Sequence, residues 1–246
     1  MIFLLPPSES KQPGGSGLPI QVSFPELDSV RSMLVRKTIS LSNKPKQALM
    51  ALKLGPNKLG ELQVNLELAE PKTMPAIDRY TGVLFDALKL GDLTKQQLAR
   101  AKESVFIQSS LFGLISALDE IPNYRLSAGA KLPGMNLRSI WASAHEGVWE
   151  HFRGELIVDL RSKSYSLLAP IPSWIESYEV AIVSEGSGGI RKALNHFNKQ
   201  SKGNFIRAAL TIAPKPIELG DLKKVAKLAG LKLEIKGKTL LLITQV

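Results

Sequence analysis

Short apolar runs alternate along the chain with longer segments in which apolar residues recur at helical spacing. The short runs predict buried strands at residues 2–5, 105–110, 155–159 and 178–184. The longer segments predict helices at residues 25–41, 44–54, 59–68, 94–104, 137–152, 190–199 and 217–229. We expect residues 111–115 to begin a further helix and residues 231–235 and 239–244 to form a closing hairpin, whereas the pattern at 205–212 fits helix or strand.

These elements predict a mixed α/β fold in which helices flank one mixed sheet. The chain has 246 residues, of which 44% are hydrophobic and 22% charged, so it can bury a substantial core. There is no internal repeat, and the Pro/Gly-rich loop at residues 13–17 is the one low-complexity segment. We therefore expect a single compact domain over residues 1–246.

The composition also constrains location and cofactors. The chain has no cysteine, which excludes disulfides and thiolate metal sites and is typical of a reducing compartment. The first apolar run stops at Pro6-Pro7, too early for a secretory leader, and no run reaches the roughly 20 apolar residues that span a bilayer. The three histidines do not have the spacing of a metal motif. We expect a cytoplasmic protein without membrane attachment, metal or cofactor.

Positive charge is concentrated near the end of the chain. The net charge is +10, and residues 185–246 carry twelve Lys/Arg against four Asp/Glu, which accounts for eight of the ten excess charges. Such a surface raises the local concentration of phosphates and nucleic acid. A solvated lysine-rich face is the alternative interpretation.

The segment from Ser184 to Lys192 is the strongest local candidate for chemistry. It follows an apolar strand, contains Gly186-Ser187-Gly188-Gly189, and is predicted to open a helix. Free N–H groups at such a point can bind an anion, and Arg191 and Lys192 add positive charge. The spacing is neither a Walker loop nor a dinucleotide fingerprint, and a tight strand–helix turn is the alternative interpretation.

Polar residues also follow the other predicted strands, where ligands bind in α/β sheets. If these loops meet at one edge, a cleft could hold a small anionic metabolite or nucleotide, with Lys11, Asp159 or Glu185 as catalytic groups. Asp159 and Arg161 could instead form a local ion pair. The remaining candidate ligand residues of this cleft are Ser8, Tyr124, Arg125, Ser162, Tyr165, Ser184 and Arg191.

Residues 44–68 could form a helix-hairpin-helix-like element. Two short predicted helices flank a turn with Gly55, Lys58 and Gly60, which could direct backbone N–H groups and a lysine at a DNA phosphate. A plain helical connection is the alternative. Further phosphate contacts would come from the basic C-terminal segment, through Lys192, Lys199 and Lys202.

Several blocks, taken in order, resemble the YaaA family of peroxide-stress proteins. No single block is specific, but their order and spacing agree over nearly the whole chain. The blocks are Leu4-Leu5-Pro6-Pro7-Ser8-Glu9-Ser10-Lys11, Tyr80-Thr81-Gly82, Ser110-Leu111-Phe112-Gly113-Leu114, Pro122-Asn123-Tyr124-Arg125-Leu126, Trp141, and Val158-Asp159-Leu160-Arg161-Ser162-Lys163-Ser164-Tyr165.

The resemblance implies an intracellular protein that limits oxidative damage, is associated with lowered free iron, and binds double-stranded DNA on one compact fold with a helix-hairpin-helix. The sequence departs from the family in two places. Gly188-Gly189 stand where the family has a lysine pair, with Arg191 retained, and Asp159 and Ser164 replace an Asn and a Glu. These departures indicate a divergent branch.

Overall fold

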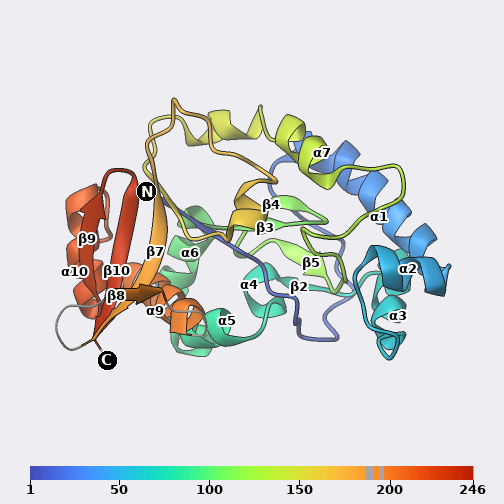
Figure 1. The fold of residues 1–246 in the computed structure, drawn as a ribbon, viewed down its shortest axis with the longest axis horizontal. Helices are drawn as coiled ribbons and strands as arrows, with labels where there is room; N and C mark the ends of the chain where they lie inside the picture. The colour runs from blue at the N-terminus through green and yellow to red at the C-terminus, as the bar shows by residue number, and fades with distance from the viewer. Residues whose placement is uncertain (187–190, 194–196, 246) are drawn as a thin grey trace.

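A mixed sheet forms the centre of the molecule, and helices cover both of its faces (Figure 1). The structure is a computed structural model, and it describes residues 1–186, 191–193 and 197–245. Helices α1 and α7 lie on one side of the sheet, and α5 and α9 lie on the other (Figure 1). The fold is therefore mixed α/β, as the alternation of strand and helix patterns predicts.

Five parallel strands form the body of the sheet, and an antiparallel strand closes each end. A short strand, β8 (Arg191–Ala193), pairs antiparallel with β7 outside this order, and β2 (Thr73–Pro75) pairs with β5 (Glu120–Pro122) in a separate ribbon. In order across the sheet the strands are β4 (Gly113–Ser116), β3 (Val105–Ser109), β1 (Ile2–Leu5), β6 (Ile157–Asp159), β7 (Ser177–Glu185), β10 (Thr239–Gln245) and β9 (Lys232–Lys236).

The central position of β1 follows from its sequence. All four of its residues are apolar and buried, as expected for a parallel strand that is covered on both faces. β1 pairs with β3 on one side and with β6 on the other. Pro6-Pro7 then end the ladder, because proline has no N–H to donate.

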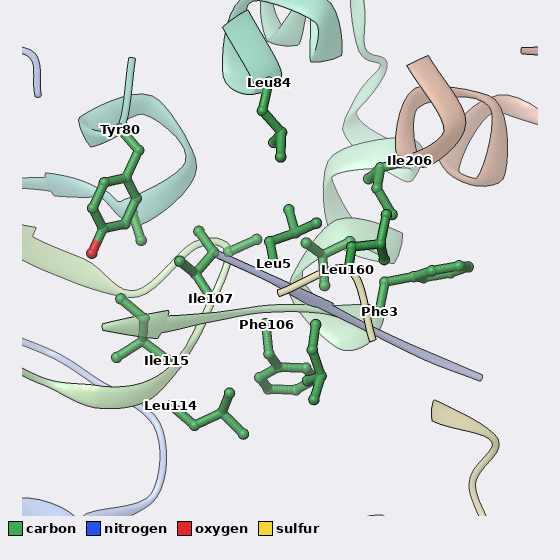
Figure 2. Packing of buried hydrophobic residues seen from close by; sticks show 14 of the residues in the cluster. Phe3, Leu5, Tyr80, Leu84, Phe106, Ile107, Leu114, Ile115, Leu160 and Ile206 are labelled. Atoms are coloured by element: carbon green, nitrogen blue, oxygen red, sulfur yellow. The ribbon is translucent and has the colours of Figure 1, made fainter. Parts of the chain in front are cut away.

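The register of these strands decides which side chains share a face. Leu4 lies beside Phe106 and Asp159, whereas Leu5 lies beside Ile107. Because successive side chains of a strand point to opposite faces, the first three belong to one face and the last two to the other. Figure 2 shows Leu5, Ile107 and Leu160 toward Leu84 and Ile206, and Phe106 and Leu114 on the opposite side.

The helices follow the predicted segments closely in the first half of the chain. Thr94 caps the helix Lys95–Ser104 through a capping box with Gln97. Gly230, at φ +72°, follows the helix Leu222–Leu228 and ends it. The helices are α1 (Asp28–Ser42), α2 (Pro45–Ala51), α3 (Gly60–Leu66), α4 (Ala76–Arg79), α5 (Val83–Leu88), α6 (Lys95–Ser104), α7 (Leu137–Ala144), α8 (Lys163–Ser166), α9 (Phe197–Thr211) and α10 (Leu222–Leu228).

Two predicted helices are wrong. Residues 111–115 turn into β4, because Gly113 adopts φ +68° and lets the chain reverse against Trp141, where a Cβ would lie 2.7 Å from the indole ring. The helix expected at 190–199 is replaced, where the structure describes it, by β8 and by the start of α9 at Phe197. The predicted helix at 137–152 is also shorter, since α7 ends at Ala144 and a 3₁₀ turn covers Val148–Phe152.

His145 lies fully buried between α7 and β4. Its Nδ1–H donates to the carbonyl of Trp141 at 2.7 Å, and its Nε2 accepts from the N–H of Leu114 at 3.1 Å. This pattern requires the neutral ring. Burial, opposed in part by the bond to Trp141, lowers the pKa of His145 to about 4.

We predict that this histidine weakens the fold in acid. Between pH 6.5 and 4 the unfolded chain binds a proton that the folded chain does not, so the free energy of unfolding falls as pH drops, by up to about 3 kcal/mol. Urea unfolding at pH 7, 5.5 and 4.5 measures the change. His145→Gln, which cannot titrate, should show a shallower pH dependence even if it is less stable at pH 7. Parallel curves for the two proteins would contradict the prediction.

Candidate functional site

The loop that follows β1 brings Lys11 against the end of α4. Lys11 forms an isolated antiparallel bridge with Tyr80. The N–H of Gln12 donates to the carbonyl of Arg79 at 2.8 Å, and the N–H of Thr81 donates to the carbonyl of Ser10 at 3.1 Å. Lys11 is therefore fixed beside Tyr80 by backbone bonds on both sides of it.

Arg79 fixes this loop from inside the protein. Its side chain is fully buried, and its guanidinium donates to the carbonyls of Gln12, Gly14, Lys72 and Ile121. These carbonyls belong to loop and ribbon segments outside the main sheet. A buried arginine suits this position because it offers five N–H donors in a rigid plane.

A chain of hydroxyl groups lies below Lys11. The Tyr124 hydroxyl lies 2.8 Å from the Tyr80 hydroxyl and 2.8 Å from Ser109 Oγ. Ser109 Oγ already accepts from the N–H groups of Leu111 and Phe112, so its own proton goes to Tyr124, and Tyr124 donates to Tyr80. Burial raises the pKa of both tyrosines, which keeps the two phenols neutral.

The amine of Lys11 lies over these rings rather than beside a carboxylate. Nζ is 4.2 Å from the centre of the Tyr124 ring and 5.4 Å from that of Tyr80. It donates to the carbonyls of Ser8 at 3.1 Å and Glu9 at 3.4 Å. Burial, reinforced by the nearby charge of Arg125, lowers the pKa of Lys11 to about 7.

Arg125 occupies the outer edge of this site. Its guanidinium pairs with Glu9 at 2.8 Å and with Glu61 at 3.5 Å. Asn65 holds its backbone from both sides, accepting from the Arg125 N–H at 2.7 Å and donating to its carbonyl at 3.0 Å. Arg125 thus connects the Lys11 loop to α3, and Glu61 also pairs with Lys58 at 3.2 Å.

Asp159 and Arg161 form the local ion pair that the sequence allowed. The guanidinium binds both carboxylate oxygens, at 2.9 and 2.8 Å, and also donates to Ala169 and Gln108. Asp159 lies on the Leu4 face of the sheet, whereas Ser109, which carries the Tyr124 network, lies on the Leu5 face. The Asp159–Arg161 pair is therefore separated by the sheet from the Tyr124 network.

The other predicted ligand residues are dispersed. Ser8 is half-buried beside Lys11, and Ser162, exposed, lies 3.1 Å from Ser164. Tyr165 is half-buried, and burial raises its pKa. The charges of Glu9 and Arg125 also affect the pKa of Tyr165, so its hydroxyl group lies near the Lys11 site. Ser184 and Glu185 end β7 and pair in register with residues 192 and 191, so residues 191–193 form a strand and not the start of a helix. The side chains of Arg191 and Lys192 and residues 187–190 lie outside the described part of the chain.

The predicted DNA-binding residues differ in exposure. Gly55, Lys58 and Gly60 are exposed, in or next to the connection between α2 and α3, and Lys199 is exposed on α9. No close contact or left-handed φ requires glycine at 55 or 60. Lys202 is buried and donates to the carbonyl of Leu160 at 2.8 Å, so it does not lie on a surface that a duplex could reach.

The sequence interpretation missed Tyr80 and Ser109 as site residues, and it missed a basic run. Tyr80 belongs to one of the family-like blocks, but the sequence does not place Tyr80 or Ser109 in a site, because pairing of distant segments makes their contacts. The basic run does give one: residues 29–60 contain seven Lys/Arg and no Asp or Glu. Summing charge over residues 1–70 hides the run, because acidic residues flank it on both sides.

The described residues contain no group of His, Asp and Glu that could hold a metal ion. Among the same residues, no helix combines the length and the apolar composition needed to cross a bilayer.

Comparison with known proteins gives the family. Residues 1–236 match the family described as peroxide stress protein YaaA. The chain belongs to the YaaA peroxide-stress family. It is 38% identical over 245 residues to a UPF0246 protein of Corynebacterium efficiens, which covers 96% of this chain and 95% of the relative.

Two further relatives show how far the similarity extends. A UPF0246 protein of Streptomyces coelicolor is 34% identical over 243 residues, covering 96% of this chain and 93% of the relative. An uncharacterized protein of Campylobacter jejuni is 29% identical over 213 residues, covering 82% of each chain. The YaaA resemblance inferred from the ordered blocks is thus confirmed over most of the chain.

We predict that the Asp159–Arg161 pair stabilises the fold. Arg161→Met should lower the free energy of unfolding by about 3–5 kcal/mol, because it leaves the Asp159 carboxylate buried without its partner. Urea unfolding of the variant and of Ser162→Ala, an exposed neighbouring control, measures the difference. An Arg161→Met protein as stable as the unaltered chain would show that the pair is available for another role.

Proposed function

We propose that this YaaA-family protein binds double-stranded DNA through a basic end formed by the second half of α1, by α2 and by the connection to α3. We call this surface the basic end, and it consists of Arg36, Lys37, Lys44, Lys46, Lys53 and Lys58. All six side chains are exposed. The observation that carries the proposal is this acid-free concentration of exposed cations.

The cations of the basic end are largely uncompensated. Within the described part of the chain, only Lys58 among the six pairs with a carboxylate, that of Glu61. Lysines without local partners are free to replace the counterions of a phosphate backbone, which is the main source of sequence-independent affinity for DNA.

A small surface pocket supports the same assignment. It has a volume of about 240 Å³ and lies between the end of α1 and the start of α2. Lys37 lines it from α1 and Lys44 from the residue before α2, and the other lining residues are Ser40, Leu41, Gln47, Leu132 and Pro133. Two amines and two neutral polar side chains around one hollow suit a single phosphate group.

The basic C-terminal segment supports DNA binding less well than its charge predicts. Lys224 lies 3.6 Å from Asp221, and Lys232 lies 3.4 Å from Glu234. Lys232 and Lys236 are on β9, the outermost strand of the sheet, where lysine prevents pairing with another chain. This region lies at the opposite end of the molecule from α2 and α3 (Figure 1).

The proposal predicts which lysines control affinity and its dependence on salt. Replacing Lys37, Lys44 and Lys46 by Gln should weaken binding of a 20-base-pair duplex by about tenfold or more at low salt, and should reduce the slope of log K against log salt by about 2 to 3. Fluorescence anisotropy at four salt concentrations between about 50 and 200 mM measures both quantities.

A matched variant separates the two basic regions. Lys223→Gln, Lys227→Gln and Lys236→Gln together remove the same charge from exposed positions on α10 and β9. This triple variant should bind nearly as tightly as the unaltered protein. Equal losses in both triple variants would indicate a net-charge effect, and no binding by the unaltered protein at low salt would rule out the proposal.

A further inference from the structure

Lys11 differs from the exposed lysines of the basic end in being half-buried, and it has no carboxylate partner of its own in the described structure. Its amine donates only to two backbone carbonyls, at 3.1 and 3.4 Å, and otherwise faces the rings of Tyr124 and Tyr80. The nearest carboxylates, Glu9 and Glu61, are both bound by Arg125. The Lys11 amine therefore lies near a strand end, while the two carboxylates that could neutralise it pair with the guanidinium of Arg125.

The surroundings favour the neutral amine. Burial removes water that would solvate an ammonium ion, and the positive charge of Arg125 opposes a second positive charge nearby. The two phenols under the amine stay protonated and so supply no negative charge. With a pKa of about 7, Lys11 is substantially neutral at physiological pH, whereas an ordinary lysine is almost fully charged.

A second observation comes from Ser110, the residue after β3. Its side chain is fully buried and interacts with the hydroxyl group of Tyr165, whose pKa is raised by burial and lowered in part by this serine. The charges of Glu9 and Arg125 act on the same phenol, so Ser110 and Tyr165 bring two further hydroxyl groups close to the Lys11 site. Ser110 adjoins Ser109, whose Oγ bonds to Tyr124, the ring beneath the Lys11 amine.

We propose that Lys11 is the nucleophile of a second site, which forms an imine with a small aldehyde or ketone. The neutral amine attacks the carbonyl carbon, and the carbonyl oxygen takes up a proton to give a carbinolamine. The nitrogen gives up its two protons in turn, and the hydroxyl takes up a second proton and leaves as water, so that R₂C=O and the Lys11 NH₂ become R₂C=N–Lys11 and H₂O. The neighbouring hydroxyl groups are the proton donors that the departing oxygen requires.

Parallel-strand topology supports this placement. β1 and β3 run side by side, and Lys11, Ser109 and Ser110 all lie at or beyond their carboxyl ends. Ligands of α/β sheets bind at that edge. The site is distinct from the basic end, and the proposal is independent of DNA binding.

Reductive methylation with formaldehyde and sodium cyanoborohydride tests this inference directly, since only an imine is reduced. At pH 7 we expect Lys11 to be modified at least about ten times faster than the exposed Lys46 and Lys163, as measured by peptide mass mapping. The rate at Lys11 should rise with pH to a midpoint near 7. A rate at Lys11 no greater than that at Lys46, or a midpoint near that of an ordinary lysine, overturns the proposal.

Two variants of Arg125 test whether Lys11 reacts because its pKa is lowered or only because its amine is accessible. Arg125→Met removes the adjacent cation and frees Glu9 and Glu61, so Lys11 should react several-fold more slowly at pH 7 and at the same rate at pH 10. Arg125→Lys keeps the positive charge and should react nearly as the unaltered protein does. A lack of difference between the two variants at pH 7 would count against the inference.

Discussion

The guanidinium of Arg79 joins the loop after β1 to the ribbon formed by β2 and β5. Four carbonyls, from Gln12, Gly14, Lys72 and Ile121, converge on this buried side chain. Without it the buried carbonyl of Ile121 would lie unpaired in the interior, which costs about 1–3 kcal/mol. The position of the Lys11 loop against Tyr80, and hence the whole strand-end site, depends on this interaction. The site is therefore part of the core rather than an addition to the surface.

Most elements could be predicted because their signals are local. The four apolar residues of β1, the Thr94 cap and the Gly230 stop all lie within the segment that they define. The errors at 111–115 and 190–199 have a different origin. Gly113 takes a left-handed φ in order to pair β4 with β3, and residues 191–193 pair with β7, so distant contacts override local helical spacing.

The candidate site was predictable only in part, because the face of the sheet to which each side chain points depends on how the strands pair. Lys11 and Tyr124 could be grouped because both follow apolar segments that lead to one edge. The sequence cannot show that Asp159 and Ser109 point to opposite faces, because that depends on the register of β6 and β3 against β1. The basic end can be recognised in the sequence, but only when charged residues are counted over a window as short as two helices.

The place of β1 in the sheet has a consequence for the order in which the protein is made. Residues 2–5 are synthesised well before their two neighbours in the sheet, which are residues 105–109 and 157–159. The most apolar strand therefore waits through the synthesis of more than half of the chain before its last partner exists. Parallel pairing over such separations is slow to form. The centre of the sheet is thus completed late, after helices such as α1 and α6 are already available to cover it.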